Sequence, residues 1–261
     1  DGGPAHDAAV QGPTGVAVDG LGNVYIAEHS VHRVRRVDRA TGIISTVAGT
    51  GAAGFAGDGG PASAAMLNSP NTVALDPHGD LFIADWNNSR VRRVDADTGI
   101  ITTVAGNGGA GGTGDGGPAT AAGLGGAPAV TVSPTGDLYI AEAVNRVRRV
   151  DGVTGVISTV AGTGTYGFAG DGGPASAAWF FFTIGVALAP DGDVLILDSY
   201  NQRVRRVDAD TQVIDTVIGD GGVASVGDGG SARAAMLSGP QGLVVEPSGA
   251  IVIADTGDNR V

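Results

Sequence analysis

Short hydrophobic runs alternate with polar, glycine-rich turns along the whole chain. Within the stretch 58–114 these runs occupy 72–75, 81–85, 90–95 and 100–105. Asp, Asn, Pro and Gly fill the segments between them, and β-branched residues dominate the last run. Runs of this length with turn residues at both ends predict short β-strands joined by tight turns. We therefore expect one four-stranded antiparallel sheet in this stretch.

The same pattern recurs at a nearly constant interval. An Asp-Gly-Gly phrase, preceded by Gly in all but the first unit, marks each unit, and its aspartates fall at Asp1, Asp58, Asp115, Asp171 and Asp228, in steps of 57, 57, 56 and 57 residues. Sheets repeated at such a period predict an all-β fold, a β-propeller of four-stranded antiparallel blades with about 57 residues per blade. Only the stretch 61–67, with Pro at its first position, predicts one or two helical turns.

The repeats predict four complete units and a partial fifth. The units begin near residues 1, 58, 115, 171 and 228, and the fifth stops at Val261, just inside its third strand. We expect residues 1–261 to form a single propeller domain. An incomplete blade leaves unpaired strand edges, which predicts a homo-oligomer or a partner segment that completes the sheet. The 261 residues are also expected to be a piece of a larger propeller, or an engineered or truncated fragment without native activity.

Several strings within one unit resemble NHL repeats. They are 71–76 (Asn-Thr-Val-Ala-Leu-Asp), 79–85 (Gly-Asp-Leu-Phe-Ile-Ala-Asp), 90–95 (Arg-Val-Arg-Arg-Val-Asp) and 98–106. The resemblance extends over the whole chain and implies an NHL-type propeller. Such propellers are mostly ligand- or protein-binding modules, for example extracellular sensor domains of bacterial kinases. Related six-bladed propellers include lyases and lactonases, and the fold alone does not choose among these functions.

The amino-acid composition limits the kinds of partner that we expect this protein to bind. The chain has no cysteine, which excludes disulfides and thiolate metal sites. Its 27 acidic and 15 basic residues give a net charge of −12, and every basic residue is arginine. An acidic chain argues against nucleic-acid binding, and no apolar run is long enough to predict membrane insertion. We expect a secreted or extracytoplasmic protein whose partner is a protein or a small ligand.

Two kinds of polar residue recur in every unit. A carboxylate ends the second strand of each unit, at Glu28, Asp85, Glu142, Asp198 and Asp255. Equal spacing around a ring would keep these groups too far apart to share one cation. We expect each instead to accept N–H groups of its own turn and to face the arginine that opens the third strand. The Arg-Val-Arg-Arg runs are expected to pair with Asp38, Asp95, Asp151 and Asp208.

Histidines break the repeat in the first unit. His29 and His32 lie in the turn after the second strand, next to Glu28, and no other unit has histidine there. Histidines three residues apart can bind a divalent metal together with a carboxylate. A metal-assisted lyase or lactonase with this site is therefore the alternative function. Because no further ligand from another unit is visible, the expected cofactor is none, and these three residues stay the weak metal candidates.

Aromatic residues break the repeat in the fourth unit. Seven of the 12 aromatic residues lie between Tyr166 and Tyr200. Phe180 replaces the apolar Leu67 of the second unit, whereas Phe181 and Phe182 replace polar residues. We expect a non-catalytic binding module or scaffold that engages a protein, peptide or carbohydrate on one rim of the propeller. The candidate ligand-binding residues are Trp86, Trp179, Phe181, Phe182, Tyr200 and Asn201. The competing interpretation is that these rings fill a gap under the long connection or cover the blade beside the open edge.

Overall fold

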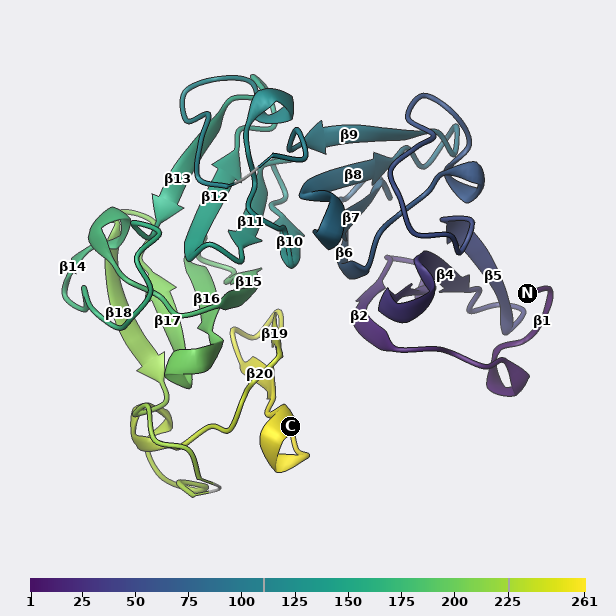
Figure 1. The fold of residues 1–261 in the computed structure, drawn as a ribbon. Helices are drawn as coiled ribbons and strands as arrows, with labels where there is room; N and C mark the ends of the chain where they lie inside the picture. The colour runs from purple at the N-terminus through teal and green to yellow at the C-terminus, as the bar shows by residue number, and fades with distance from the viewer. Residues whose placement is uncertain (110, 225) are drawn as a thin grey trace. The chain divides into compact units, whose positions relative to one another are not determined.

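The chain folds into antiparallel sheets of the expected kind (Figure 1). The computed structural model describes residues 1–109, 111–224 and 226–261. We number the sheets as blades 1 to 5 in chain order. Each of the four blades before the last contains a four-stranded antiparallel ladder, and the last is a two-stranded sheet. The predicted all-β fold of four-stranded antiparallel blades is thereby confirmed, whereas the count of four complete units and a partial fifth stays a prediction.

The strands follow the repeat closely. Blade 1 has the order β1-β5-β4-β3-β2 and contains β1 (Gly3–Pro4), β2 (Pro13–Val18), β3 (Val24–Glu28), β4 (Arg33–Val37) and β5 (Ile43–Ala48). Blade 2 contains β6 (Pro70–Leu75), β7 (Leu81–Asp85), β8 (Arg90–Val94) and β9 (Ile101–Ala105) in chain order. Blade 3 likewise contains β10 (Ala129–Val132), β11 (Leu138–Glu142), β12 (Arg146–Val150) and β13 (Ile157–Ala161).

Blade 4 repeats the order of blade 1. Its order is β14-β18-β17-β16-β15, with β14 (Gly173–Pro174), β15 (Thr183–Leu188), β16 (Val194–Asp198), β17 (Arg203–Val207) and β18 (Val213–Ile218). Blade 5 pairs β19 (Gly242–Val245) with β20 (Ile251–Ala254). The helical segments are single 3₁₀ turns: η1 (Ala5–Asp7), η2 (His29–Val31), η3 (Ala62–Ala64), η4 (Trp86–Asn88), η5 (Ala119–Ala121), η6 (Ala175–Ala177), η7 (Ser199–Asn201), η8 (Ala232–Ala234) and η9 (Thr256–Asp258).

The helical turns predicted for 61–67 are shorter than expected. Only η3 forms, and Ala65 already has an extended backbone with φ −76° and ψ 156°. The next residue, Met66, donates its N–H to the Ala56 carbonyl at 3.2 Å. The stretch therefore turns once and then pairs with the connection before it, because the connection offers a backbone partner that a longer helix would forgo.

The Gly-Asp-Gly-Gly-Pro phrase, expected to be a turn, adds an edge to its own blade. Gly3 and Pro4 pair with Ile44 and Ile43 of β5, and Gly173 and Pro174 pair with β18 in the same way. In blade 2 the contact is a single bridge between Pro61 and Ile100. Proline is suited to this place because an edge residue needs no N–H on its outer side.

The aspartate of the phrase neutralises a buried arginine. In blade 2 the fully buried Arg92 donates to Asp58 Oδ1 through Nη2 at 2.6 Å and Nε at 3.0 Å. Thr103 Oγ1 donates to the other oxygen of Asp58 at 2.7 Å. Blade 1 repeats both contacts with Asp1, and in blade 4 Arg205 Nη2 lies 2.7 Å from Asp171. A buried guanidinium requires such a partner, since its desolvation is otherwise uncompensated.

The carboxylates that end the second strands belong to the scaffold, as expected, but with partly different partners. Asp85 accepts the backbone N–H of Asn68 at 2.7 Å, from the segment before the first strand, whereas its own turn donates through the side-chain amide of Asn88 at 2.8 Å. Glu28 does pair with Arg33, at 2.5 Å, as expected. In blade 2, however, the inward-facing Arg92 approaches Asp85 at 3.5 Å, because Arg90 donates instead to two backbone carbonyls.

The expected pairing of the third arginine with the following aspartate is confirmed in blades 1 and 2. Arg36 lies 3.1 Å from Asp38, and Arg93 lies 3.3 Å from Asp95. In blade 4 the equivalent Arg206 contacts Asp191 at 2.8 Å, and it also contacts Asp193. These contacts lie at the strand ends and hold the turns rather than forming a basic stripe.

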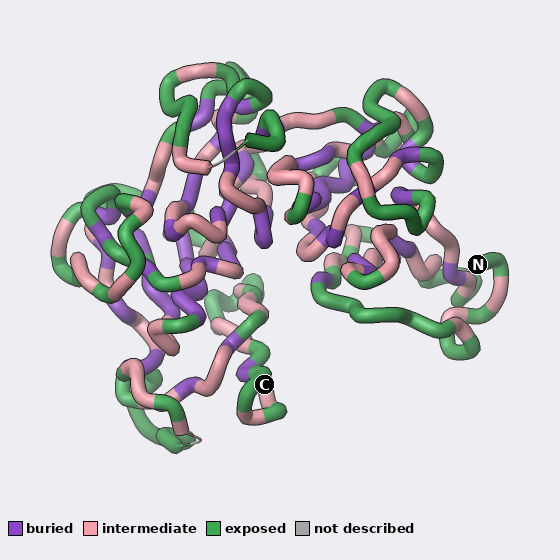
Figure 2. Tube along the Cα trace, in the orientation of Figure 1, coloured by how far each residue is buried: buried purple, intermediate pink, exposed green. Residues whose placement is uncertain are grey.

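The chain divides into two compact units, which we describe separately. The first contains residues 1–138 and 150–157, and the second contains residues 139–149 and 158–261. Each has apolar residues packed between neighbouring strands, and Figure 2 shows that buried residues gather along the strands while the connections are exposed. A single domain over 1–261 stays a prediction. Within the described ranges no helix is long and apolar enough to cross a membrane.

Candidate functional site on the fourth blade

Four aromatic side chains of blade 4, in the second compact unit, form a row, which we call the aromatic row: Tyr166, Phe181, Tyr200 and Phe182. The ring centroids of Tyr166 and Phe181 are 6.0 Å apart. The rings of Phe181 and Tyr200 meet edge-on, with their centroids 5.0 Å apart. The ring centroid of Phe182 also lies 5.0 Å from that of Tyr200, with an angle of 34° between the two ring planes. These are favourable ring geometries, so the row forms one continuous surface.

The row faces solvent, unlike the aromatic residue next to it in the chain. Tyr166 is 73% exposed, Tyr200 57% and Phe181 41%, whereas Phe180 is fully buried. Phe180 therefore takes the core position of Leu67, as the sequence predicts. Trp179 is also exposed and donates its N–H to the Ala169 carbonyl at 3.2 Å, beside the connection that carries Tyr166.

Blade 2 shows what the row replaces. By the repeat, the positions of Tyr166, Phe181, Phe182 and Tyr200 correspond to Ala53, Asn68, Ser69 and Asn87. There Asn87 Nδ2 donates to Ser69 Oγ at 3.0 Å. The backbone contact beneath is the same in both blades, since Tyr200 donates to the Phe181 carbonyl and Asn87 donates to the Asn68 carbonyl, each at 3.1 Å. The fourth blade thus keeps the scaffold and exchanges a polar surface for an aromatic one.

Phe182 has a backbone conformation that is unfavourable for a phenylalanine. Its φ is +63°, in the left-handed region. The equivalent residues of the other blades share that conformation and are Gly12, Ser69, Gly126 and Gly239. A bulky residue there costs about 1–2 kcal/mol relative to glycine. Strain kept at one half-buried position, beside exposed rings, points to a function for that side chain.

A buried carboxylate holds the row in place. Phe181 donates its N–H to Asp198 Oδ1 at 2.8 Å, and Arg205 lies 3.6 Å from the same carboxyl group. Burial raises the pKa of Asp198 to about 6, against the lowering effect of these hydrogen bonds and of Arg205. Phe182 donates its N–H to Asn145 Oδ1 at 2.7 Å. Both phenylalanines are therefore fixed through their backbones, while Phe181 is exposed and Phe182 is half-buried beside it.

The structure brings together only part of the predicted ligand-binding set. Phe181, Phe182 and Tyr200 are in contact, and Tyr166, which the predicted set omitted, joins them. The sequence could have indicated Tyr166, because it lies in the same aromatic-rich stretch, 166–200, as the other three. Asn201 lies under the row, but its amide donates to Gly167 O at 2.7 Å and Asp198 Oδ2 at 2.8 Å. Trp86 belongs to blade 2, in the first compact unit, where it packs against His29 of blade 1 with ring centroids 5.7 Å apart.

The weak metal candidates of blade 1 have other partners. Glu28 is fully buried and accepts the Gln11 N–H at 2.8 Å in addition to Arg33. His32 Nδ1 accepts the N–H of Ser69 at 3.0 Å. His29 Nδ1 is buried without a hydrogen bond, and burial lowers the pKa of His29, helped by nearby His32. Among the described residues no group of three or more His, Asp or Glu side chains is placed to hold a metal.

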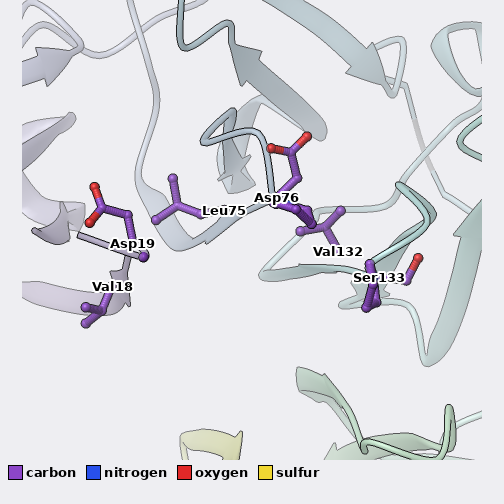
Figure 3. A pocket seen from close by; sticks show the side chains of 9 residues that line it. Val18, Asp19, Leu75, Asp76, Val132 and Ser133 are labelled. Carbon is purple, nitrogen blue, oxygen red and sulfur yellow. The ribbon is translucent and has the colours of Figure 1, made fainter. Parts of the chain in front are cut away.

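A hollow of about 320 Å³ lies on the first unit, where the turns after β2, β6 and β10 meet. Figure 3 shows apolar walls from Val18, Leu75 and Val132, with Asp19, Asp76 and Ser133 beside them. The three polar side chains cap their own turns, as when Asp19 accepts from Asn23 Nδ2 at 2.7 Å and Ser133 Oγ accepts the Asp137 N–H at 3.0 Å. Their hydrogen bonds are therefore those of turn formation.

Sequence comparisons place this chain near repeat proteins. A model of the NHL repeat matches residues 11–37 and 67–94. The Protein SUPPRESSOR OF QUENCHING 1, chloroplastic, of Arabidopsis thaliana is 28% identical over 280 aligned positions, which cover 99% of this chain. The chain spans about a quarter of the length of that relative, since it covers 25% of it.

Solved structures share the fold. An auxiliary nutrient binding protein from Bacteroides ovatus superposes with a TM-score of 0.68 at 15% identity, over 97% of this chain and 59% of its own. Virginiamycin B lyase from Staphylococcus aureus superposes with a TM-score of 0.56, also at 15% identity, over 95% of this chain and 65% of its own. A binding protein and an enzyme on one fold leave the activity open. The chain therefore contains NHL repeats at residues 11–37 and 67–94, and its blades and structural neighbours show a β-propeller fold.

Proposed function

We propose that this protein is a non-catalytic binding module that engages its ligand through the aromatic row of blade 4. The observation that carries the proposal is the exchange of a hydrogen-bonded polar surface for exposed rings on an unchanged backbone. Aromatic residues that filled a gap would be buried, as Phe180 is, whereas Tyr166 and Tyr200 are more than half exposed. Exposed apolar surface of this kind is typical of interaction sites.

The proposal includes an extracytoplasmic location and a partner outside the chain. A neighbour that is an auxiliary nutrient-binding protein supports a ligand-binding role. The location extends the proposal beyond the row and is independent of it.

The test compares the protein with a variant that restores the second blade's residues, Phe181→Asn with Phe182→Ser. A panel of immobilised peptides and neutral oligosaccharides is probed with both. We expect at least one class to bind the natural sequence and to lose most of that binding in the variant, while circular dichroism and urea unfolding stay unchanged. The matched control is Phe55→Leu, which removes a ring that stacks on Arg90 and Arg92 in blade 2.

Two results would overturn the proposal. One is binding that survives the double exchange undiminished. The other is loss of the fold in the variant, which would mean that the rings fill space. Tyr166→Ala separates these cases, because its ring is the most exposed of the row and its removal leaves the blade's core intact.

A further inference from the structure

We infer that the aromatic row recognises a proline-rich peptide in the polyproline II conformation. The inference rests on the proposed function and names the ligand class of the same site. Three features of the row carry it: the loss of side-chain hydrogen-bonding groups, the two free tyrosine hydroxyls and the absence of ionised groups.

The row has lost the polar side chains that a sugar would require. Relative to blade 2, two amides and one hydroxyl have become rings at Phe181, Tyr200 and Phe182. The amides that remain nearby are engaged: Asn201 donates to Gly167 O and Asp198, and Asn145 Oδ1 accepts the Phe182 N–H. A ligand with many hydroxyls would leave most of them unpaired on this surface, which costs affinity.

The two tyrosines supply what a polyproline helix needs. Neither the Tyr166 nor the Tyr200 hydroxyl has a hydrogen-bond partner among the residues that the structure describes, and both side chains are mostly exposed. A polyproline II helix has no internal hydrogen bonds, so its carbonyls are free to accept from such hydroxyls. Its pyrrolidine rings are apolar and rest on aromatic surfaces, and its shape is formed before binding, which lowers the entropic cost.

Charge selects among proline-rich sequences. The row itself contains only uncharged side chains, and the carboxylate beneath it, Asp198, is fully buried. The chain as a whole has a net charge of −12. Its field attracts cations and repels anions, so a proline-rich segment flanked by arginine or lysine will associate faster than one flanked by acidic residues.

The experiment measures fluorescence anisotropy of a labelled oligoproline peptide with terminal arginines, titrated with the whole protein. A peptide of the same length and charge with glycine in place of proline is the control ligand. We expect the proline peptide to bind at least about tenfold more tightly than the glycine peptide. Phe181→Asn with Phe182→Ser, and separately Tyr166→Ala, should each weaken binding of the proline peptide by about tenfold.

The repeat allows the reverse experiment. Placing the row on blade 2 by Ala53→Tyr, Asn68→Phe, Ser69→Phe and Asn87→Tyr should create a second site of similar affinity and double the stoichiometry of a saturating titration. Equal binding of both peptides, or binding unaffected by Tyr166→Ala, would overturn the inference. Row-dependent binding of neutral oligosaccharides, with none of the proline peptide, would overturn it as well but would leave the proposed binding function standing.

Discussion

At the residue scale, two adjacent phenylalanines have opposite environments. Phe180 is fully buried and Phe181 is 41% exposed. The sequence predicted this difference, because blade 2 has the apolar Leu67 at the position of Phe180 and the polar Asn68 at the position of Phe181. It did not predict the strained backbone of Phe182, because the left-handed conformation shared by this position in all blades becomes visible only once their φ angles are compared.

The two neighbours should therefore differ in their effect on stability. Phe180→Ala is expected to lower the free energy of unfolding by about 4 kcal/mol, because it empties a core site. Phe181→Ala should change it by less than about 1 kcal/mol, as is usual for surface positions. Urea unfolding followed by circular dichroism measures both. Equal losses would show that the row is part of the core.

Asp198 gives a prediction about pH. Its pKa is raised in the folded state to about 6, above the ordinary value of 3.8, so between these values the folded chain binds more protons than the unfolded chain. The contribution of this group to stability therefore falls as pH rises through that window. From pH 7 to pH 5 the natural sequence should gain about 1 kcal/mol relative to Asp198→Asn. Unfolding curves of the two proteins that shift in parallel would contradict the raised pKa.

At the element scale, neighbouring blades are joined by a recurring bond that we call the blade latch. A side chain at the end of the turn after the second strand of one blade accepts a backbone N–H from the next blade. The donor is the residue with positive φ before that blade's first strand. The acceptor–donor pairs are His32–Ser69, Ser89–Gly126, Asn145–Phe182 and Gln202–Gly239. The strands could be predicted from their pattern, but the latch could not. Its acceptor is a different residue type in each blade, so it leaves no repeated signal in the sequence.

The latch of blade 1 is expected to contribute measurably to stability. His32→Ala removes the acceptor of the Ser69 N–H, which should lower the free energy of unfolding by about 1 kcal/mol. His32→Asn, which copies the latch residue Asn145, should keep most of that stability because an amide oxygen can accept the same bond. Urea unfolding at neutral pH measures both variants, and equal losses would show that this bond contributes nothing measurable.

The repeated aspartate should matter more than its exposed position suggests. Asp58→Ala removes the main partner of the fully buried Arg92, which is expected to lower the free energy of unfolding by about 3 kcal/mol. The control is Asp97→Ala in the exposed turn of the same blade, expected to be neutral. Thermal or urea unfolding of the two variants decides. The spacing of 34 residues between Asp58 and Arg92 recurs in other blades, so this contact could have been predicted from the sequence.

At the scale of the whole molecule, the period identified the fold and the departures from the period identified the candidate site. The blades are predictable because each local signal agrees with the others, from the turns to the β-branched strands. The site is only partly predictable. Trp86 and Asn201 looked equivalent to the row in sequence, but the first packs on His29 and the second is used inside its blade. Only side-chain geometry separates them.

The most direct test of the binding function maps the bound ligand onto the repeat. Amide NMR signals are followed while the proline-rich peptide, or any ligand from the panel, is added. The account predicts that shifts concentrate at Tyr166, Phe181, Phe182 and Tyr200, while the equivalent amides of Asn68, Ser69 and Asn87 stay unchanged as an internal reference. Shifts centred instead on the hollow beside Asp19, Asp76 and Ser133 would contradict the aromatic row as the binding surface.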